Sequence, residues 1–178
     1  MLLNKSQPSP ILIIAIETLN GEVFGSFTTT VWKKRNSFFG KGNGKNDAFL
    51  WRLKNGRMIP RKLISKGNDS NLEVFPYTRI DELVQFCDSD RLVVGGGEWI
   101  ESESPFPNAP NGPGLVLDAD LCQGESFSCS TFSNPPLCRD FSFKISNVET
   151  WTITPCETLD GAEMHEKTSI DNGNAMMI

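Results

Sequence analysis

Short segments of alternating or uniformly apolar residues recur along the chain, and they predict β-strands. Residues 11–16 form a β-branched apolar run, which predicts a strand buried on both faces. Asn20-Gly21 predicts a hairpin turn after this strand. Residues 22–28 predict the returning strand, with Phe24 and Phe27 on opposite faces. The pattern therefore begins with an antiparallel hairpin.

The same kind of pattern continues beyond the hairpin. Residues 49–54 alternate in polarity and predict a half-buried strand. Gly25, inside the second strand, predicts a bulge or a close approach of two backbones. Further strands are predicted at residues 72–77, 84–87, 91–95, 114–117, 141–145 and 148–153. Many short strands without a helical period predict a mostly β fold with two antiparallel sheets, a β-sandwich.

Length and composition indicate one domain. The chain has 178 residues, of which 38% are hydrophobic and 22% charged. We expect a polar lead-in at residues 1–10, the folded domain at 11–155 and a polar, disordered tail at 156–178. No apolar run approaches the roughly 18 residues of a membrane-spanning helix. The 5 cysteines lack regular spacing, which favours reduced thiols and a cytoplasmic protein.

Charge is divided unevenly along the chain. Residues 1–72 contain 12 Lys and Arg against 4 Asp and Glu, whereas residues 73–178 contain 5 against 18. A pI near 4.9 argues against nucleic acid as a partner. The basic run Lys33, Lys34 and Arg35 is a candidate binding site for an acidic surface, and its alternative is a solvated loop. Trp99, in a loop rich in Pro and Gly, is a second candidate contact for a partner.

Three motifs resemble chemical sites and have simpler interpretations. The Gly95-Gly96-Gly97 run lacks a following helix, which a phosphate site requires, so it indicates a turn. Asp88 with Asp90 and Asp118 with Asp120 are acidic pairs without the spacing of a calcium loop. We interpret both pairs as groups that cap turns, and we assign no metal or cofactor to the chain.

The nucleophilic residues form no complete catalytic set. Cys122, Cys129 and Cys138 do not have the spacing of a zinc site. His165, the single histidine, lies in the predicted disordered tail, so a Ser-His-Asp or Cys-His pair would depend on a disordered residue. Cys129 lies among hydroxyl residues and is a candidate redox thiol, with a small buried side chain as the alternative. The sequence therefore identifies no catalytic residue.

An ordered series of motifs resembles the TLDc domain, the module of the oxidation-resistance protein and several multidomain relatives. The matching segments are Gly21–Thr28 with Trp32, Ser37–Gly40 leading to Phe49-Leu50, Val74–Thr78, Phe86–Asp90, Leu92–Gly97, Gly114–Asp118, Asp120-Leu121, Gly124, Cys129–Phe132, Asn134–Leu137 and Val148–Trp151. The resemblance implies a β-sandwich flanked by short helices and a role in protein interaction and stress resistance. It also implies that the vacuolar proton-pumping ATPase is a partner, and it brings no established catalytic centre.

Three hypotheses follow. The first is a non-enzymatic TLDc-like interaction module, tied to oxidative-stress resistance and to regulation of the vacuolar proton-pumping ATPase, with peripheral contact to a membrane. The second is a redox enzyme or peroxide scavenger that uses Cys129. The third is a truncated, non-functional domain, because the family resemblance implies a further N-terminal stretch and the matched pattern starts at residue 11. Residues 54–72 and 98–113 resemble insertions relative to the family pattern.

Overall fold

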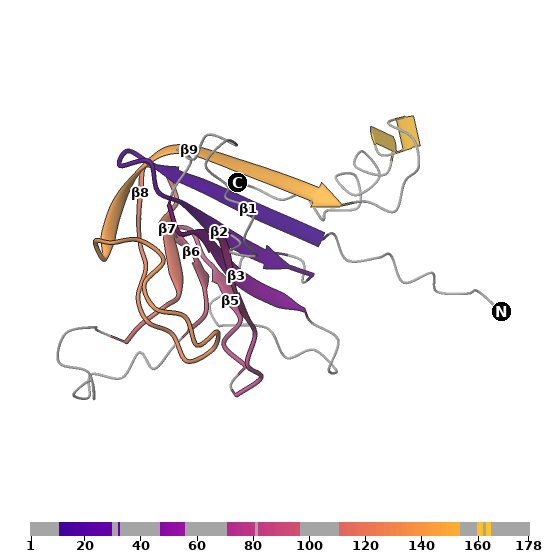
Figure 1. The fold of residues 1–178 in the computed structure, drawn as a ribbon. Helices are drawn as coiled ribbons and strands as arrows, with labels where there is room; N and C mark the ends of the chain where they lie inside the picture. The colour runs from indigo at the N-terminus through magenta and orange to yellow at the C-terminus, as the bar shows by residue number, and fades with distance from the viewer. Residues whose placement is uncertain are drawn as a thin grey trace, which may run out of the picture.

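Nine antiparallel strands make up the part of the chain that the structure describes. The computed structural model describes residues 11–29, 32, 47–55, 71–80, 82–96, 111–153, 160–161 and 163–164. The strands are β1 (Ile11–Thr18), β2 (Val23–Thr28), β3 (Ala48–Leu53), β4 (Leu72–Pro76), β5 (Gln85–Cys87), β6 (Arg91–Val94), β7 (Leu115–Asp118), β8 (Gln123–Glu125) and β9 (Ser142–Ile153). They confirm the mostly β, antiparallel prediction (Figure 1). Helical structure in the described part of the chain is confined to residues 160–161 and 163–164.

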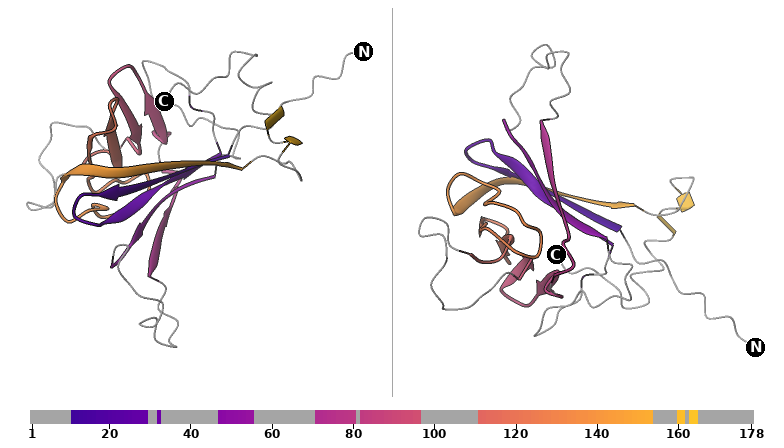
Figure 2. Two further views of the ribbon diagram at one scale, coloured as in Figure 1. Left: turned by 90° about the horizontal axis from the view of Figure 1, so that it is seen from above. Right: turned by 60° about the horizontal axis from the view of Figure 1, so that its bottom comes forward.

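The strands form one continuous sheet in the order β4-β3-β2-β1-β9-β8-β7-β6-β5. Strand β9 joins two halves: residues 142–144 pair with β8, and residues 145–153 pair with β1. We call β4-β3-β2-β1 half A and β8-β7-β6-β5 half B. In Figure 2 the two halves leave β9 in different directions. The sandwich therefore consists of two layers that share one strand.

The sequence predicted two closing strands where the structure has the single strand β9. The register between β1 and β9 is irregular at one point, where Glu17 pairs with Asn147 but Thr18 pairs with Ile145. This irregularity changes which side chains face the core along β9, so the alternation breaks there although the strand continues. The predictions at 141–145 and 148–153 are thus two parts of one element.

Strands β1 and β2 pack through one face and approach each other closely. Alternate residues of β1, beginning with Leu12, are buried, and the others are only partly covered, so the prediction of burial on both faces is wrong. Gly25 confirms the predicted close approach: a Cβ at this position would overlap the carbonyl oxygen of Ile14. The same Cβ would lie 3.0 Å from Cζ2 of Trp51, so the indole ring lies against the bare backbone of Gly25.

The core is shared by both halves. Phe24 of β2 and Phe143 of β9 are buried and meet edge to face, with ring centroids 4.9 Å apart. Burial of a phenylalanine contributes about 2–3 kcal/mol. The rest of the buried cluster comes from both halves and from the connecting segments: Leu12, Ile14, Ile16, Trp32, Ala48, Leu50, Val84, Val94, Leu115, Leu117, Cys129, Phe132, Leu137 and Cys138. Packing between the layers thus depends on residues far apart in the sequence.

Candidate functional site

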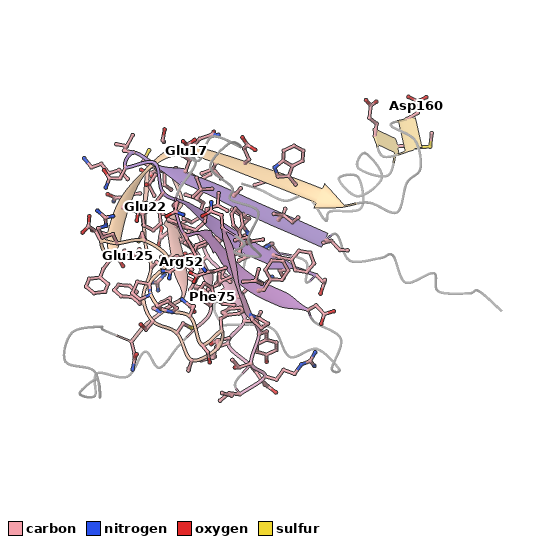
Figure 3. The ribbon with its side chains drawn as sticks, in the orientation of Figure 1. Glu17, Glu22, Arg52, Phe75, Glu125 and Asp160 are labelled. Atoms are coloured by element: carbon pink, nitrogen blue, oxygen red, sulfur yellow. The ribbon has the colours of Figure 1, made fainter. Side chains whose placement is uncertain are left out.

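The outer face of half B has a groove with a volume of about 560 Å³. It lies where the turn between β1 and β2 meets the outer sides of β6, β7, β8 and β9. Its charged residues are two cations and two anions, contributed by four strands: Arg91, Asp118, Glu125 and Lys144. Figure 3 shows the side chain of Glu125 on the outer side of this half.

The charged residues of the groove come together through strand register. Arg91 pairs with Asp118 across β6 and β7, and Gln123 pairs with Lys144 across β8 and β9. Nε2 of Gln123 donates a hydrogen bond of 2.7 Å to Oδ2 of Asp118. Nε of Arg91 lies 3.6 Å from a carboxylate oxygen of Asp88. The result is a row of charged and polar side chains across the outer face, with charges of both signs.

The lining of the groove also includes two apolar residues that are buried, Val116 and Phe143. Gly124 lies between them, and a Cβ there would come within 2.7 Å of Cζ of Phe143. A side chain at this position would therefore displace the Phe143 ring. An open groove lined by charged and polar side chains suits a polypeptide segment better than an enclosed small molecule.

The turns beside the groove confirm the capping interpretation of both acidic pairs. Oδ1 of Asp88 accepts hydrogen bonds from the backbone N–H groups of Asp90, at 2.8 Å, and of Arg91, at 2.9 Å. Partial burial raises the pKa of Asp88, but these two N–H donors and the charge of Arg91 lower it overall. Oδ1 of Asp120 accepts from the N–H of Cys122. In the described residues no group of three or more His, Cys, Asp or Glu could hold a metal ion.

Gly95 and Gly96 follow β6, and Gly97 lies outside the described residues, so the turn over these three glycines stays a prediction. Gly95 has φ of 77°, a conformation that side-chain-bearing residues rarely adopt. Its N–H donates to the carbonyl of Val84, and the N–H of Gly96 donates to that of Leu83. These N–H groups are engaged by backbone, so they are not available to a phosphate.

The outer face of half A is apolar and differs in character from the groove. Phe27 and Phe49 stack with their ring centroids 4.6 Å apart, and Trp51 lies against Gly25 beside them. At the sides of this face Trp151 of β9 is 59% exposed and Val74 of β4 is 47% exposed. A face with aromatic rings and large exposed side chains is typical of contact surfaces.

Arg52 anchors half A to a connecting segment and was not identified from the sequence. Its Nε donates a 2.6 Å hydrogen bond to Oε2 of Glu73, and its Nη1 donates one of 2.8 Å to the carbonyl of Pro136. The guanidinium also lies 5.7 Å from the ring centre of Phe75, as Figure 3 allows the reader to follow. The hydrogen bond from Arg52 holds the pKa of Glu73 below its usual value. These contacts give Arg52 a structural role.

The structure places one of the site residues predicted from the sequence. Lys33, Lys34, Arg35 and Trp99 lie outside the described residues, so they stay predictions. Cys129 is buried, and a Cβ at Gly95 would lie 2.8 Å from its Sγ. Burial raises the pKa of the Cys129 thiol, although a hydrogen bond involving Thr131 opposes this shift. A buried thiol with a raised pKa is a weak nucleophile, which favours the packing interpretation of Cys129.

The groove residues were not identified from the sequence because they come from separate strands. Arg91 and Lys144 are more than fifty residues apart and meet only through the strand order. The available signal was the placement of charged residues at the outward positions of β6, β7, β8 and β9. These charged positions can be recognised as one site only once the strand register is known. No helix within the described residues is long and apolar enough to cross a membrane.

Comparison with known proteins identifies relatives of different kinds. Oxidation resistance protein 1 of Yarrowia lipolytica is 30% identical over 141 residues, which cover 79% of this chain and 49% of that protein. The GTPase-activating protein skywalker of Drosophila melanogaster is 30% identical over 150 residues, covering 82% of this chain and 22% of that protein. Nuclear receptor coactivator 7 of Gallus gallus is 29% identical over 148 residues, which cover 83% of this chain and 13% of that protein. The chain thus matches about half of the first relative and less than a quarter of the other two.

A family model covers most of the chain. The model of the TLDc domain matches residues 1–154, which include all nine strands. The motifs at Gly21–Thr28 and Val148–Trp151, on which the resemblance rested, lie on strands of half A and on β9. The chain therefore belongs to the TLDc domain family.

Proposed function

We propose that this chain is a non-enzymatic TLDc interaction module that acts in resistance to oxidative damage. The observation that supports it most is the match to the family over residues 1–154, together with a relative named Oxidation resistance protein 1. The same segment covers 49%, 22% and 13% of relatives that have different names. A segment shared by such different proteins is expected to be a portable binding unit.

The groove on half B supplies a physical basis for this role. Arg91, Lys144, Asp118 and Glu125 all line the groove, so a partner with the matching charge pattern would be recognised and steered. Such contacts are exposed and lose strength at high salt. We further propose that the vacuolar proton-pumping ATPase is the partner, met in the cytoplasm at the membrane surface, as the family resemblance implies.

The test combines survival under peroxide with recovery of the partner. Cells that lack the endogenous gene would receive the wild-type chain or an Arg91→Glu, Lys144→Glu variant. We expect the variant to lose protection and to recover at least roughly tenfold less ATPase subunit in pull-downs. Asp160→Lys changes an exposed carboxylate outside the groove and is the control. Full protection by the groove variant would contradict the role of the groove, and protection without ATPase recovery would contradict that partner.

The sequence-predicted contacts enter the same assay. We propose that Lys33, Lys34 and Arg35 and, separately, Trp99 contribute to partner binding. Reversal of the three charges, or Trp99→Ala, should weaken pull-down while the urea midpoint stays unchanged. Unchanged affinity would exclude them. Cys129→Ser tests the redox alternative: unchanged peroxide protection in this variant would exclude a Cys129 enzyme, whereas loss of protection with normal folding would support one.

A further inference from the structure

Among the described residues, the C-terminal part of β9 has a strand neighbour on one side only. Its register with β1 runs unbroken from Asn147, opposite Glu17, to Ile153, opposite Ile11. On the other side β8 pairs only with residues 142–144, and the described ranges place no strand beside 147–153. Figure 1 shows this part of β9 running past β8 along the border of half A. In an antiparallel strand, every second residue directs its N–H and C=O to the same side, so this border presents a row of backbone donors and acceptors.

The other sheet borders are shorter than this one. Strand β4 has five residues and ends in Pro76, and β5 has three. Short length, proline, lysine and bulges are the usual means by which proteins block unwanted strand pairing. Residues 147–153 contain neither Pro nor Lys, and the register irregularity lies before them. Of the borders that the structure describes, this one is best suited to accept a further strand.

The side chains of this border indicate the chemistry of an added strand. Glu149 and Trp151 are exposed and lie on the same face of β9, with Trp151 beside Ile13 of β1. Oε1 of Glu149 accepts a 3.2 Å hydrogen bond from Nδ2 of Asn147, and the side chain is exposed to solvent. Opposite charges and aromatic or β-branched partners are the favourable cross-strand pairs. A partner strand should therefore place Lys or Arg opposite Glu149 and an aromatic or β-branched residue opposite Trp151.

Charge argues against a second copy of this chain as the occupant. Antiparallel self-pairing would bring Glu149 of β9 and Glu17 of β1, which lies opposite Asn147, from both copies onto one face of the joined sheet. On the face that carries Glu149 and Glu17, the described residues of β1 and β9 include no Lys or Arg. The whole chain also has a net charge of −5. Both observations favour a cationic strand from another protein.

We propose that residues 147–153 of β9 accept an extended strand of a partner protein, with Lys or Arg opposite Glu149 and an aromatic or β-branched side chain opposite Trp151. This inference rests on the proposed interaction role and deepens it, because it names a binding surface distinct from the groove. Main-chain hydrogen bonds would supply affinity, and the two side-chain pairs would supply selectivity.

The first experiment uses the full chain and an acetylated, amidated peptide, Ser-Thr-Tyr-Val-Lys-Thr-Ser. Its Tyr and Lys are two residues apart, so they match Trp151 and Glu149 in an antiparallel pairing. We expect the peptide to slow amide hydrogen exchange at residues 147–153 and not along β4. Two further peptides carry N-methyl groups on one or the other alternate set of residues. Only one of them should lose binding, because a strand pairs through one edge.

The second experiment reverses the charge pair. Glu149→Lys should weaken the Lys peptide roughly three- to tenfold in fluorescence anisotropy, and a peptide with Glu in place of Lys should recover that loss. Asp90→Lys makes the same charge change at an exposed turn between β5 and β6 and should leave affinity unchanged. Trp151→Ala should weaken binding of the Lys peptide to the chain with Glu149, and binding of the Glu peptide to the Glu149→Lys variant.

Four outcomes would overturn the inference. They are equal binding of both N-methyl peptides, protection at β4 instead of β9, absence of peptide binding, and self-association that protects residues 147–153 without peptide. The readouts need no ATPase and no peroxide. If the peptide pairs with β9 but the chain does not protect cells from peroxide, this inference stands and the proposed function is contradicted. If the chain protects cells but the peptide does not pair with β9, the proposed function stands and this inference is contradicted.

Discussion

At the scale of single residues, Gly25 is the position where the backbone leaves least room. Its missing side chain allows β2 to lie against the Ile14 carbonyl and allows the Trp51 ring to lie across β2. We predict that Gly25→Ala lowers the free energy of unfolding by about 3 kcal/mol, because the new Cβ overlaps backbone that cannot move without separating the strands. Urea denaturation followed by tryptophan fluorescence measures this loss.

Gly21 provides a matched comparison for Gly25. It has φ of 78°, and a Cβ there would meet nothing within 4 Å. Gly21→Ala therefore introduces backbone strain without a steric overlap and should cost about 1 kcal/mol. Equal losses in the two variants would show that the close approach at Gly25 does not limit stability.

Cys138 makes stability depend on alkaline pH. Burial, followed by the negative charge of Glu22, raises the pKa of its thiol from 9.0 to about 12. Below pH 9 both the folded and the unfolded chain keep this proton, and the contribution of Cys138 to stability is complete. Above pH 9 the unfolded chain releases the proton first, so stability should fall progressively towards about pH 12.

The variant Cys138→Ala isolates this effect. It also loses the hydrogen bond from Sγ to the carbonyl of Asp140, so its stability should be lower at every pH. The informative quantity is the slope: the urea midpoint of the variant should decline less steeply above pH 9 than that of the wild type. Parallel slopes would assign the alkaline decline to other groups.

At the scale of elements, Phe143 is the buried β9 residue of the core cluster, against which Ile145 and Val148 also pack while only partly buried. The Phe143 ring meets Phe24 of β2 and lies over Gly124 of β8. We predict that Phe143→Ala lowers the free energy of unfolding by about 3–5 kcal/mol, since it opens a cavity where the two halves meet. Phe141→Ala is the control: Phe141 is 39% exposed and should cost about 1 kcal/mol. A similar loss of unfolding free energy in both variants would show that Phe143 does not provide the main packing of β9 against the core.

Alternation along the chain was sufficient to predict most strands and the first hairpin. Leu50 shows what alternation omits, because residues 49–54 predict a half-buried strand without naming its buried face. Leu50 faces the core, and the larger Phe49 and Trp51 face outward. The prediction missed β8, because Gln123 and Glu125 flank Gly124 and provide no apolar signal. Single-sequence patterns report local polarity, and the choice between faces depends on what the other half covers.

The candidate groove was less predictable than the fold. Asp88 and Asp120 were correctly interpreted as capping residues because that chemistry is local. Arg91 and Lys144, in contrast, become neighbours of the groove only through the order β9-β8-β7-β6, and no local signal marks that order. Arg52 and its contact with the Pro136 carbonyl are equally non-local.

At the scale of the whole molecule, both halves should unfold together. Half A and half B contribute to one buried cluster, so neither has a complete core of its own. We predict a single urea transition in which tryptophan fluorescence, which reports Trp32, Trp51, Trp99 and Trp151 together, coincides with thiol labelling of the buried Cys129. Labelling of Cys129 at lower urea than the fluorescence change would show that the halves unfold separately.

The shared strand also constrains how the protein is made. Strand β1 ends at Thr18, but its partner β9 begins at Ser142 and lies beside it in the finished sheet. At about 5–20 residues per second, a nascent β1 has one open flank for roughly 6 to 25 s before a ribosome has synthesised that partner. During this interval the β-branched segment Ile11–Ile16 is exposed to aggregation. Chaperone capacity during translation should therefore limit the yield of this domain more than its final stability does.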